Sequence, residues 1–498
     1  MQIAEDFDVV VIGGGPGGST ASTLLAMQNH RVLLLERDKF PRYQIGESLL
    51  PATIHGICKM LGLSEELKKA GFVRKLGGTF RWGKNAEPWT FNFSTASTIS
   101  APKAYAYQVE RQKFDTMLLR NAARKGVDVR EQHAVKSLLF DGDRVCGVEF
   151  VDTDGNTRIA NAMYVIDASG HQSHVYKHVG ERIYSNFFQN LALFGYYEGG
   201  DRFPAPRDGN IFCAAFEEGW FWYIPLSNTL TSVGAVVSKQ YVDQLKVGHE
   251  EAMNRFIASC PEISRLLTNA RRVTEGVYGE LRVRRDWSYT NERFWKPGMV
   301  LVGDAACFID PVFSSGVHLA TYSALLAARS INSILTDEMD EDRCFEEFEK
   351  RYRREFRNFY EFLTAFYDMH QHEDSYFWKA RKILKTEASM QEAFVTLVAG
   401  GSSMGDEELL VDNKKIEQIK GELQVLENVD EDAAPYFSAE KEAFLDVLVE
   451  EATQIQTQAS VGSKRGAEKP LFENGLIPSA DGFRWREATA SSTAASGM

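Results

Sequence analysis

Three glycines near the start of the chain have the spacing of a phosphate-binding turn. Gly13, Gly15 and Gly18 fill a GxGxxG pattern between the apolar stretches 9–12 and 32–35. Small residues follow the glycines, so the segment predicts a strand, a helix and a second strand. In such a turn the first glycine permits a tight bend, the second lets a pyrophosphate approach the backbone, and the third lets the helix pack on the strand.

Glu36 lies where a dinucleotide-binding unit usually has an acidic residue. Glu36 follows the second apolar stretch, and a carboxylate at that position can accept hydrogen bonds from both ribose hydroxyls. The alternative is a glycine-rich turn that binds nothing. The strand before the glycines, the helix after them and the acid together favour dinucleotide binding.

Two more turns follow apolar strands further along the chain. "KPGMVLVGDAAC" ends a strand with Gly303 and Asp304, and "AMYVIDASGHQS" ends another with Asp167. An aspartate at such a place can bind a sugar hydroxyl. The three turns together resemble the para-hydroxybenzoate hydroxylase class of FAD-dependent enzymes, in which all three touch one FAD. No second GxGxxG is present for a nicotinamide; "GGSSMG" at 400–405 lacks the spacing.

The stretch "GWFWYIPL" at 219–226 places two tryptophans two positions apart. In an extended strand Trp220 and Trp222 share one face, while Phe221 and Tyr223 occupy the other. Taken alone, such a pair is usually core packing, since aromatic residues belong in strands. Proline ends the strand because it cannot continue the ladder.

Two motifs together identify a resemblance to the flavin-dependent halogenases. "GWFWYIP" fits the WxWxIP pattern of that family, and "FIDPVFSSG" fits its FxxPxxSxG pattern through Phe308, Pro311, Ser314 and Gly316. The resemblance covers roughly residues 7–335. It implies an enzyme of secondary metabolism, such as antibiotic biosynthesis, that uses reduced FAD, O2 and chloride or bromide to make hypohalous acid.

The resemblance also implies roles for particular residues. "FPRYQIGESLLPAT" is similar to the family's segment that covers the flavin, and Arg111 is similar to an arginine set beside it. The tryptophans would line the region near the flavin. The implied flavin-binding residues of these segments are Arg42, Glu47, Ser48 and Arg111, and the implied active-site wall comprises Trp220, Trp222, Phe308, Pro311 and Phe313.

A halide requires an anion site beside the flavin. The "SSG" turn precedes a helix expected to start near Val317, and exposed amides at a helix N-terminus attract anions. Ser315 and Gly316 are therefore the halide candidates. The alternative is a serine that only caps the helix.

The family uses a lysine at the far end of a tunnel from the flavin, and "GFVRKLGGTF" places Lys75 where the pattern expects it. A protonated lysine can hydrogen-bond and polarise hypohalous acid, whereas a neutral one can form a chloramine, which needs a pKa lowered from about 10.4 toward neutrality. Both mechanisms remain open. Without the resemblance, a lysine in a loop is usually a solvated charge.

The substrate expectation follows from one departure from the family pattern. Tryptophan halogenases carry a glutamate directly before the first serine of the glycine loop, and here that residue is Phe313. A phenol or pyrrole is electron-rich enough to need less help. We therefore expect a phenolic aromatic substrate, either a free small molecule or a tyrosyl or pyrrolyl group on a carrier protein.

Composition limits the remaining function classes. A net charge of −13 argues against nucleic acid or an anionic membrane as partner, and no apolar run reaches the roughly 20 residues of a bilayer span. The six cysteines form no CxxC pair, we assign no metal, including at His370 and His372, and no signal peptide is evident. A cytoplasmic location is expected.

The predicted fold class is α/β: a Rossmann-like FAD-binding domain with an interleaved antiparallel substrate-side sheet and a C-terminal, mainly helical region. The expected boundaries are 1–75, 101–185 and 291–335 for the FAD domain, 76–100 and 186–290 for the sheet, 336–485 for the helical region, and 486–498 for a disordered tail. The aromatic residues after position 337 have helical spacing and predict a core stripe.

Without a nicotinamide site, the enzyme should need a separate NAD(P)H-dependent flavin reductase. Two other functions remain open. A single-component FAD monooxygenase would hydroxylate its substrate, and a noncatalytic flavoprotein would bind FAD for a structural or redox-sensing role.

Overall fold

The computed structural model describes residues 4–83, 87–96, 103–367, 389–400 and 470–488. Its first layer is an eight-stranded sheet with β1 (Ala4–Ile12) at the centre. β1 pairs in parallel with β10 (Thr157–Asp167) and β2 (Val32–Glu36), the order that a βαβ unit requires. The sheet continues through β7 (Asp128–Glu131), β8 (Ala134–Asp141), β9 (Arg144–Val151), β17 (Trp295–Lys296) and β18 (Met299–Leu301).

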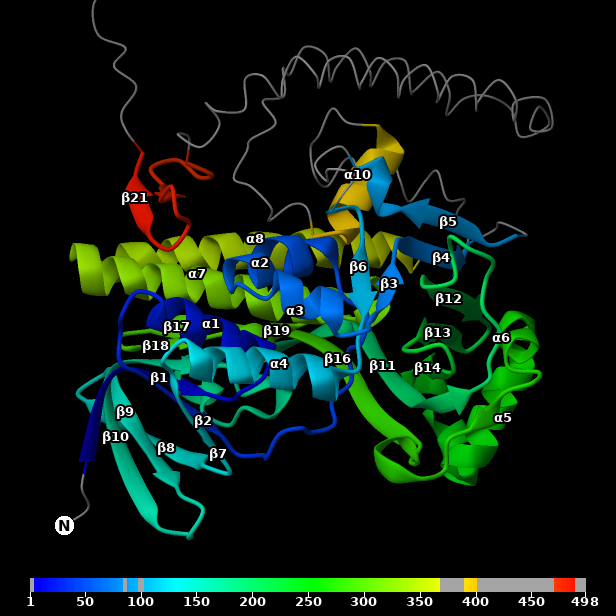
Figure 1. The fold of residues 1–498 in the computed structure, drawn as a ribbon, viewed down its shortest axis with the longest axis horizontal. Helices are drawn as coiled ribbons and strands as arrows, with labels where there is room; N and C mark the ends of the chain where they lie inside the picture. The colour runs from blue at the N-terminus through cyan, green and yellow to red at the C-terminus, as the bar shows by residue number, and fades with distance from the viewer. Residues whose placement is uncertain (1–3, 84–86, 97–102, 368–388, 401–469, 489–498) are drawn as a thin grey trace, which may run out of the picture.

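Helices pack together beside this sheet, above its strands in the view of Figure 1. α1 (Pro16–Ala26) contacts α4 (Arg111–Arg124) and α7 (Ser315–Asp337), and small residues allow the close approach. A Cβ on Gly17, for example, would lie only 3.1 Å from the Val302 side chain. α8 (Glu341–Phe366) runs beside α7 and buries the predicted aromatic stripe: Phe345, Phe348, Tyr352, Phe359, Phe362 and Phe366.

The second layer is a nine-stranded sheet that occupies the predicted substrate-side segments. Its strands are antiparallel except for one parallel pair, β12 with β4, because a long stretch of chain separates these two strands. α5 (His249–Ser259) and α6 (Pro261–Leu266) cover one face. The strands are β4 (Gly77–Arg81), β5 (Trp89–Asn92), β11 (Arg182–Glu198), β12 (Ile211–Phe216), β13 (Gly219–Pro225), β14 (Leu230–Ser238), β15 (Arg271–Arg272), β16 (Arg282–Asn291) and β19 (Cys307–Phe308).

Strand β13 separates two hydrophobic cores. Trp220 and Trp222 belong to the main core, whereas Phe221 and Tyr223 belong to the smaller core under α5 and α6. The strand period therefore places the tryptophans on one face, as predicted.

Short elements complete the described chain. β3 (Val73–Lys75) pairs with β6 (Ala106–Gln108), and β20 (Leu476–Pro478) with β21 (Trp485–Glu487). The latter two strands lie in and just beyond the range expected to be helical, because the buried Trp485 fixes them on α7 through Ser330 and Ser333. Residues 489–498 of the expected tail lie outside the described part.

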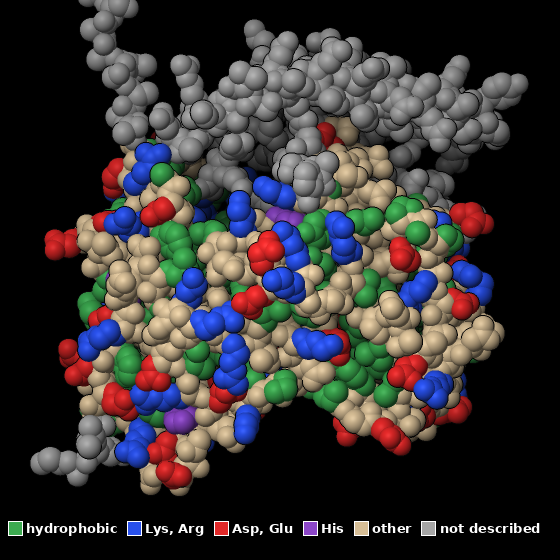
Figure 2. Space-filling view, in the orientation of Figure 1, with side chains coloured by type: hydrophobic (Ala, Val, Ile, Leu, Met, Phe, Trp, Pro, Cys, Tyr) green, Lys and Arg blue, Asp and Glu red, His purple; other side chains and the backbone are tan. Residues whose placement is uncertain are grey.

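The other short helices are a π-helical turn at Ala52–Ile57, α2 (Cys58–Met60), α3 (Ser64–Lys69), α10 (Met390–Val398), and 3-10 turns at Phe93–Thr95, Gly170–Gln172, Tyr176–His178, Lys239–Val247, Gly276–Tyr278, Gly303–Ala305 and Pro311–Phe313. Among the described residues, we find no helix that is long and apolar enough to cross a membrane. Figure 2 shows acidic and basic side chains interspersed over one face of the molecule.

Candidate active site

The GxGxxG turn has the geometry of a phosphate-binding loop. Gly13 has a φ of +99°, and a Cβ there would lie 2.7 Å from the backbone oxygen of Ala168. A Cβ on Gly18 would lie 1.9 Å from the backbone oxygen of Gly13, so only glycine lets α1 pack this closely. At Gly15 the nearest atom would be Nη2 of Arg42, at 3.5 Å. The second glycine is therefore the one that leaves room for a ligand.

Glu36 ends β2 beside this turn and is 5% exposed. Its Oε2 accepts a hydrogen bond from the backbone N–H of Gly14 at 2.6 Å, and its Oε1 accepts one from that of Asp38 at 2.8 Å. The backbone thus holds the carboxylate at the end of the strand, where the sequence places the ribose-binding acid.

Two successive strands on one side of β1, β10 and then β18, bring the other two turns to the same edge. Ile12 pairs with Asp167, and Asp167 pairs with Leu301, two residues before Gly303. Asp167 accepts hydrogen bonds from Ser169 and Ser173, so its carboxylate shapes its own turn. Gly303 has a φ of +63° and donates its N–H to the Ser323 hydroxyl at 3.0 Å.

Asp304 differs from Asp167 because we find no hydrogen bond to its carboxylate within the described part of the chain. Burial raises the pKa of Asp304, and the positive charges of Arg284, Arg111 and Arg182 oppose that rise. An acceptor surrounded by arginines at the end of this sheet suits a hydroxyl of a bound cofactor.

Arg111 fixes the 42–48 segment, which lies between β2 and the first strands of the second layer. Its guanidinium pairs with Asp115, with Nε 2.7 Å from Oδ1, and its Nη1 donates to the backbone oxygen of Ile45 at 2.6 Å. Arg42 also pairs with Asp115, at 3.1 Å. The two arginines therefore hold the 42–48 segment against α4, next to the three turns.

The tryptophans form a buried wall on the inner face of the second sheet. Trp220 and Trp222 are 1% and 6% exposed, and their ring centroids are 6.2 Å apart. Trp222 donates its indole N–H to the Ser232 hydroxyl at 3.1 Å, and Trp220 donates to the Tyr367 hydroxyl at 2.7 Å. Because both N–H groups have partners, the rings are fixed in orientation.

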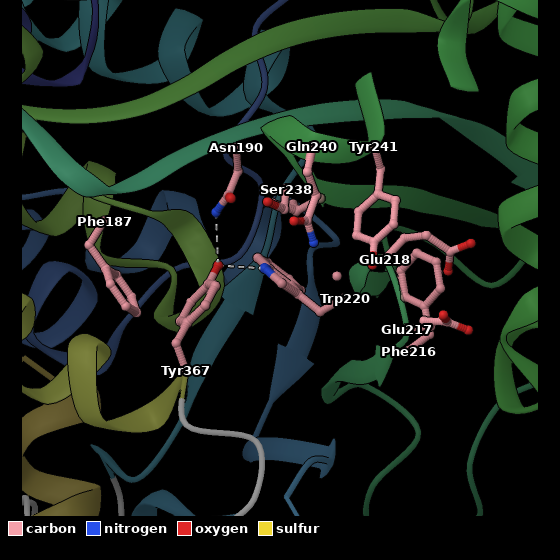
Figure 3. Close-up of a pocket in the computed structure, with 12 residues that line it drawn as sticks. Phe187, Asn190, Phe216, Glu217, Glu218, Trp220, Ser238, Gln240, Tyr241 and Tyr367 are labelled. Carbon is pink, nitrogen blue, oxygen red and sulfur yellow. Dashed lines mark hydrogen bonds between the residues drawn. The ribbon is translucent and has the colours of Figure 1, made fainter. Parts of the chain in front are cut away.

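A pocket with a volume of about 260 Å³ lies at the Trp220 end of this wall (Figure 3). The hydroxyl of Tyr367 accepts hydrogen bonds from Trp220 and from Asn190 there, and donates to the Asp310 carboxylate. Burial raises the pKa of Asp310 to about 6, and the hydrogen bond from Tyr367 acts against that rise. Tyr367 thus connects the tryptophan wall to the 308–316 loop.

The 308–316 loop leads into the N-terminus of α7. Pro311 opens a 3-10 turn, and Ser314 has a φ of +61°. α7 begins at Ser315, two residues before the predicted start. The buried Ser315 hydroxyl has no hydrogen-bond partner among the described residues, and a Cβ on Gly316 would meet open space. An orphan hydroxyl and free space at a helix N-terminus fit a small anion.

Lys75 lies in strand β3, and its environment is not that of a loop lysine. The side chain is 2% exposed, and its Nζ donates to the Ser48 hydroxyl at 2.9 Å and to the backbone oxygen of Leu49 at 3.1 Å. It also lies 5.6 Å from the ring centre of Phe93. Burial lowers the pKa of Lys75 to about 7. No carboxylate of the described chain forms a salt bridge with it.

Aromatic side chains from the second sheet and from α8 surround Phe313. Phe313 packs on Phe366 and Phe362, with ring centroids at 4.7 and 5.1 Å, and on Phe80 at 6.1 Å. Phe313 thus contributes an apolar ring where a glutamate would have brought a charge. Phe308 is partly buried and packs against Tyr289 at the opposite end of the loop.

Sequence reasoning missed several residues of this site. Tyr196, Asp310 and Tyr367 are buried hydrogen-bonding groups, and Arg284 faces Asp304. Of these four residues, only Arg284 could have been noticed from the sequence, because it lies in the basic stretch "RVRRDW". Among the described residues, no group of three or more His, Cys, Asp or Glu is placed to hold a metal ion, and His370 and His372 lie outside that part.

The turns at the carboxyl edge of the first sheet define a flavoprotein of the Rossmann-like class. The space beside Gly15 and the Asp304 carboxylate, which accepts no hydrogen bond from the described residues, fit FAD. The family model described as "Tryptophan halogenase" matches residues 8–101 and 94–420. The chain belongs to this family, and it is a flavin-dependent halogenase, an oxidoreductase that uses FAD and a halide.

Curated relatives and solved structures agree with this assignment. A tryptophan 2-halogenase of Chondromyces crocatus is 33% identical over 418 residues, covering 82% of this chain and 78% of the relative. A flavin-dependent halogenase of Acremonium egyptiacum is 31% identical, covering 87% and 81%. The structure of the myxobacterial chondrochloren halogenase, at 52% identity, covers 97% of this chain and 100% of its own, with a TM-score of 0.74. A flavin-dependent brominase has a TM-score of 0.70 at 26% identity, covering 84% and 99%.

Proposed function

We propose that this enzyme halogenates a phenolic aromatic with hypohalous acid that Lys75 receives and directs. The proposal is supported above all by the burial of Lys75, which has no acidic partner in the described part of the chain and whose Nζ is held by Ser48 and Leu49. A buried lysine without a counter-charge is costly for the fold, so its presence indicates a chemical role.

Reduced FAD, when bound, supplies the electrons with which O2 oxidises the halide to hypohalous acid. The chain's own residues would bind and separate the reactants. Gly13, Gly15, Gly18 and Glu36 would hold the dinucleotide, and the Ser315 hydroxyl with the Gly316 amide would hold chloride or bromide. The tryptophan wall would exclude the organic substrate from the flavin side.

Lys75 would act on the oxidant once it forms. With a pKa of about 7, the ammonium and the neutral amine are both populated near neutral pH. The ammonium can donate a hydrogen bond to hypohalous acid, and the amine can exchange its proton for halogen. The structure is compatible with either mechanism.

A phenolic substrate suits the apolar residue at position 313. Phe313 offers a ring face and no carboxylate, so the arene must supply its own activation, as a phenol hydroxyl does. Free phenols and tyrosyl or pyrrolyl groups carried on a protein both meet this requirement. We also propose that a separate flavin reductase supplies reduced FAD.

The test is a mass-spectrometric assay with FAD, a flavin reductase, NADH, O2 and either chloride or bromide. The panel contains free phenols, carrier-bound tyrosyl and pyrrolyl groups, and free tryptophan. We expect a phenolic or tyrosyl product with a halogen isotope pattern that depends on the halide. Halogenated tryptophan as the main product would contradict the substrate proposal, and a product that gains only oxygen without halide would contradict halogenation.

A further inference from the structure

Glu47 is a buried carboxylic acid at the end of the 42–48 segment and is 2% exposed. Its Oε1 accepts a hydrogen bond from the Tyr196 hydroxyl at 2.7 Å. Its Oε2 is buried and has no hydrogen-bond partner among the described residues. An unpaired buried oxygen is costly unless another molecule uses it.

A second tyrosine continues the hydrogen-bond chain outward. The hydroxyl of Tyr43 lies 2.8 Å from that of Tyr196, and Tyr43 is only half-buried. The guanidinium of Arg282 lies 4.0 Å from the centre of the Tyr43 ring. The chain Tyr43, Tyr196, Glu47 therefore runs from the rim of the protein to a buried acid.

The inner end of this chain lies between the two parts of the active site. Arg111 binds the backbone of Ile45, and its charge interacts with both Glu47 and Asp304. The next residue after Glu47 is Ser48, whose hydroxyl accepts from Lys75. Glu47 thus lies beside the flavin turn and one residue away from the lysine partner.

Flavin-dependent halogenation consumes one proton in the buried active site. The net reaction takes FADH2, O2, a halide ion and one proton, and gives FAD, hypohalous acid and one water molecule. Atoms and charge balance only if that proton is delivered in each turnover. The inference that follows rests on flavin-dependent halogenation and not on the roles proposed for Lys75 or for a phenol.

We propose that Tyr43, Tyr196 and Glu47 form the path by which this proton enters the active site. The hydroxyls can each accept a proton on one side and donate one on the other. Glu47 in its protonated form releases a proton from Oε2 as Oε1 accepts one from Tyr196, and rotation of the carboxyl group then returns the proton to the Oε2 side. Tyr196 and Tyr43 are relay residues in this path and touch neither substrate nor halide.

The charges around Glu47 are consistent with a carboxyl that gains and loses a proton near neutral pH. Burial raises its pKa to about 7, while the nearby Ser232 hydroxyl, the hydrogen bond from Tyr196 and the charge of Arg111 act against that rise. Glu110 adds to the rise, and Glu47 in turn raises the pKa of Tyr43 and Tyr278. Arg282 and Arg284 are the cations that face Tyr43.

Tyr278 provides a matched control for the relay. Its ring lies 4.2 Å from that of Tyr196, but its hydroxyl donates to Glu110 at 2.9 Å and forms no link to Glu47. Tyr278→Phe therefore removes a hydroxyl from the same cluster without breaking the path.

The test compares Tyr196→Phe, Tyr43→Phe and Tyr278→Phe as FAD-loaded proteins. With reduced FAD and chloride, we expect hypochlorous acid formation at pH 8 to fall at least tenfold in the first two variants. Small weak acids, such as imidazolium, should restore most of the loss. Tyr278→Phe should retain the wild-type rate.

A second measurement does not depend on turnover. The absorbance of oxidised bound FAD, titrated with pH, should follow Glu47 with a midpoint near 7 in the wild type, and Glu47→Gln should abolish the transition. Tyr196→Phe should raise the midpoint, because it removes a hydrogen bond that favours the carboxylate.

Equal rates in Tyr196→Phe and Tyr278→Phe, or no rescue by weak acids, would overturn the proposal. If Tyr196→Phe does not bind FAD, Tyr43→Phe decides the outcome by the same criteria.

Discussion

The burial of Lys75 should make the free energy of unfolding depend on pH. In the unfolded chain its pKa is about 10.4, whereas burial lowers it to about 7 in the folded protein. Between these pH values the unfolded chain binds a proton that the folded chain does not. The free energy of unfolding therefore rises with pH across this window, by about 5 kcal/mol in total.

Lys75→Met should consequently stabilise the protein at pH 7. The loss of the charge penalty is offset by the Ser48 hydroxyl and the Leu49 carbonyl losing their donor, at about 1–3 kcal/mol. We expect a net gain of about 1–3 kcal/mol at pH 7, measured by urea unfolding, that disappears near pH 10. A variant that is less stable than the wild type at pH 7, or equally different at both pH values, would contradict a buried lysine of low pKa.

At the scale of elements, the end of α8 holds the tryptophan wall and the 308–316 loop in one arrangement. Tyr367→Phe removes the hydroxyl that accepts from Trp220 and donates to Asp310. Leaving these buried groups unpaired should lower the free energy of unfolding by about 1–3 kcal/mol. The chloride concentration for half-maximal rate should also rise, because the Asp310 end of the loop is no longer fixed, while FAD affinity should not change.

Tyr360→Phe is the matched control on the same helix, since the Tyr360 hydroxyl has a single hydrogen-bond partner among the residues that the structure describes, the Ser185 hydroxyl at 2.9 Å. We expect its effect on unfolding to stay below about 1 kcal/mol and its chloride dependence to match the wild type. If both variants show the same chloride dependence, Tyr367 does not position the loop.

The elements themselves were largely predictable because their signals are local. The glycine spacing predicted the β1, α1, β2 unit, and the strand period placed Trp220 and Trp222 on one face. Partners distant in sequence were not predictable. Tyr196 is 149 residues from Glu47, and Tyr367 is 57 residues from Asp310. Such contacts depend on how strands and helices pack, and no local periodicity encodes them.

The same reason explains why the surroundings of Lys75 were not evident from its neighbours in the sequence. Lys75 lies in a three-residue strand that pairs with the equally short β6, so its burial depends on a segment distant in sequence. In the C-terminal region, the ring of Trp485 packs against the guanidinium groups of Arg329 and Arg351, which are also distant in sequence. No local periodicity encodes either arrangement.

At the scale of the whole molecule, the two layers have different proposed roles. The first sheet and its turns carry the glycines and acids that we propose to bind FAD, and the second layer with β3 carries the tryptophan wall and Lys75. Formation of hypohalous acid and its transfer to the arene should therefore be separable by mutation.

The most direct measurement is a single turnover of wild type and Lys75→Ala with reduced FAD, O2, chloride and the best phenol of the panel, recording both O2 consumption and the chlorinated product by mass spectrometry. The account predicts that Lys75→Ala consumes O2 at the wild-type rate, binds FAD normally and loses product at least a hundredfold. Retention of the chlorinated product by Lys75→Ala would contradict the central claim that this lysine directs the halogenating species.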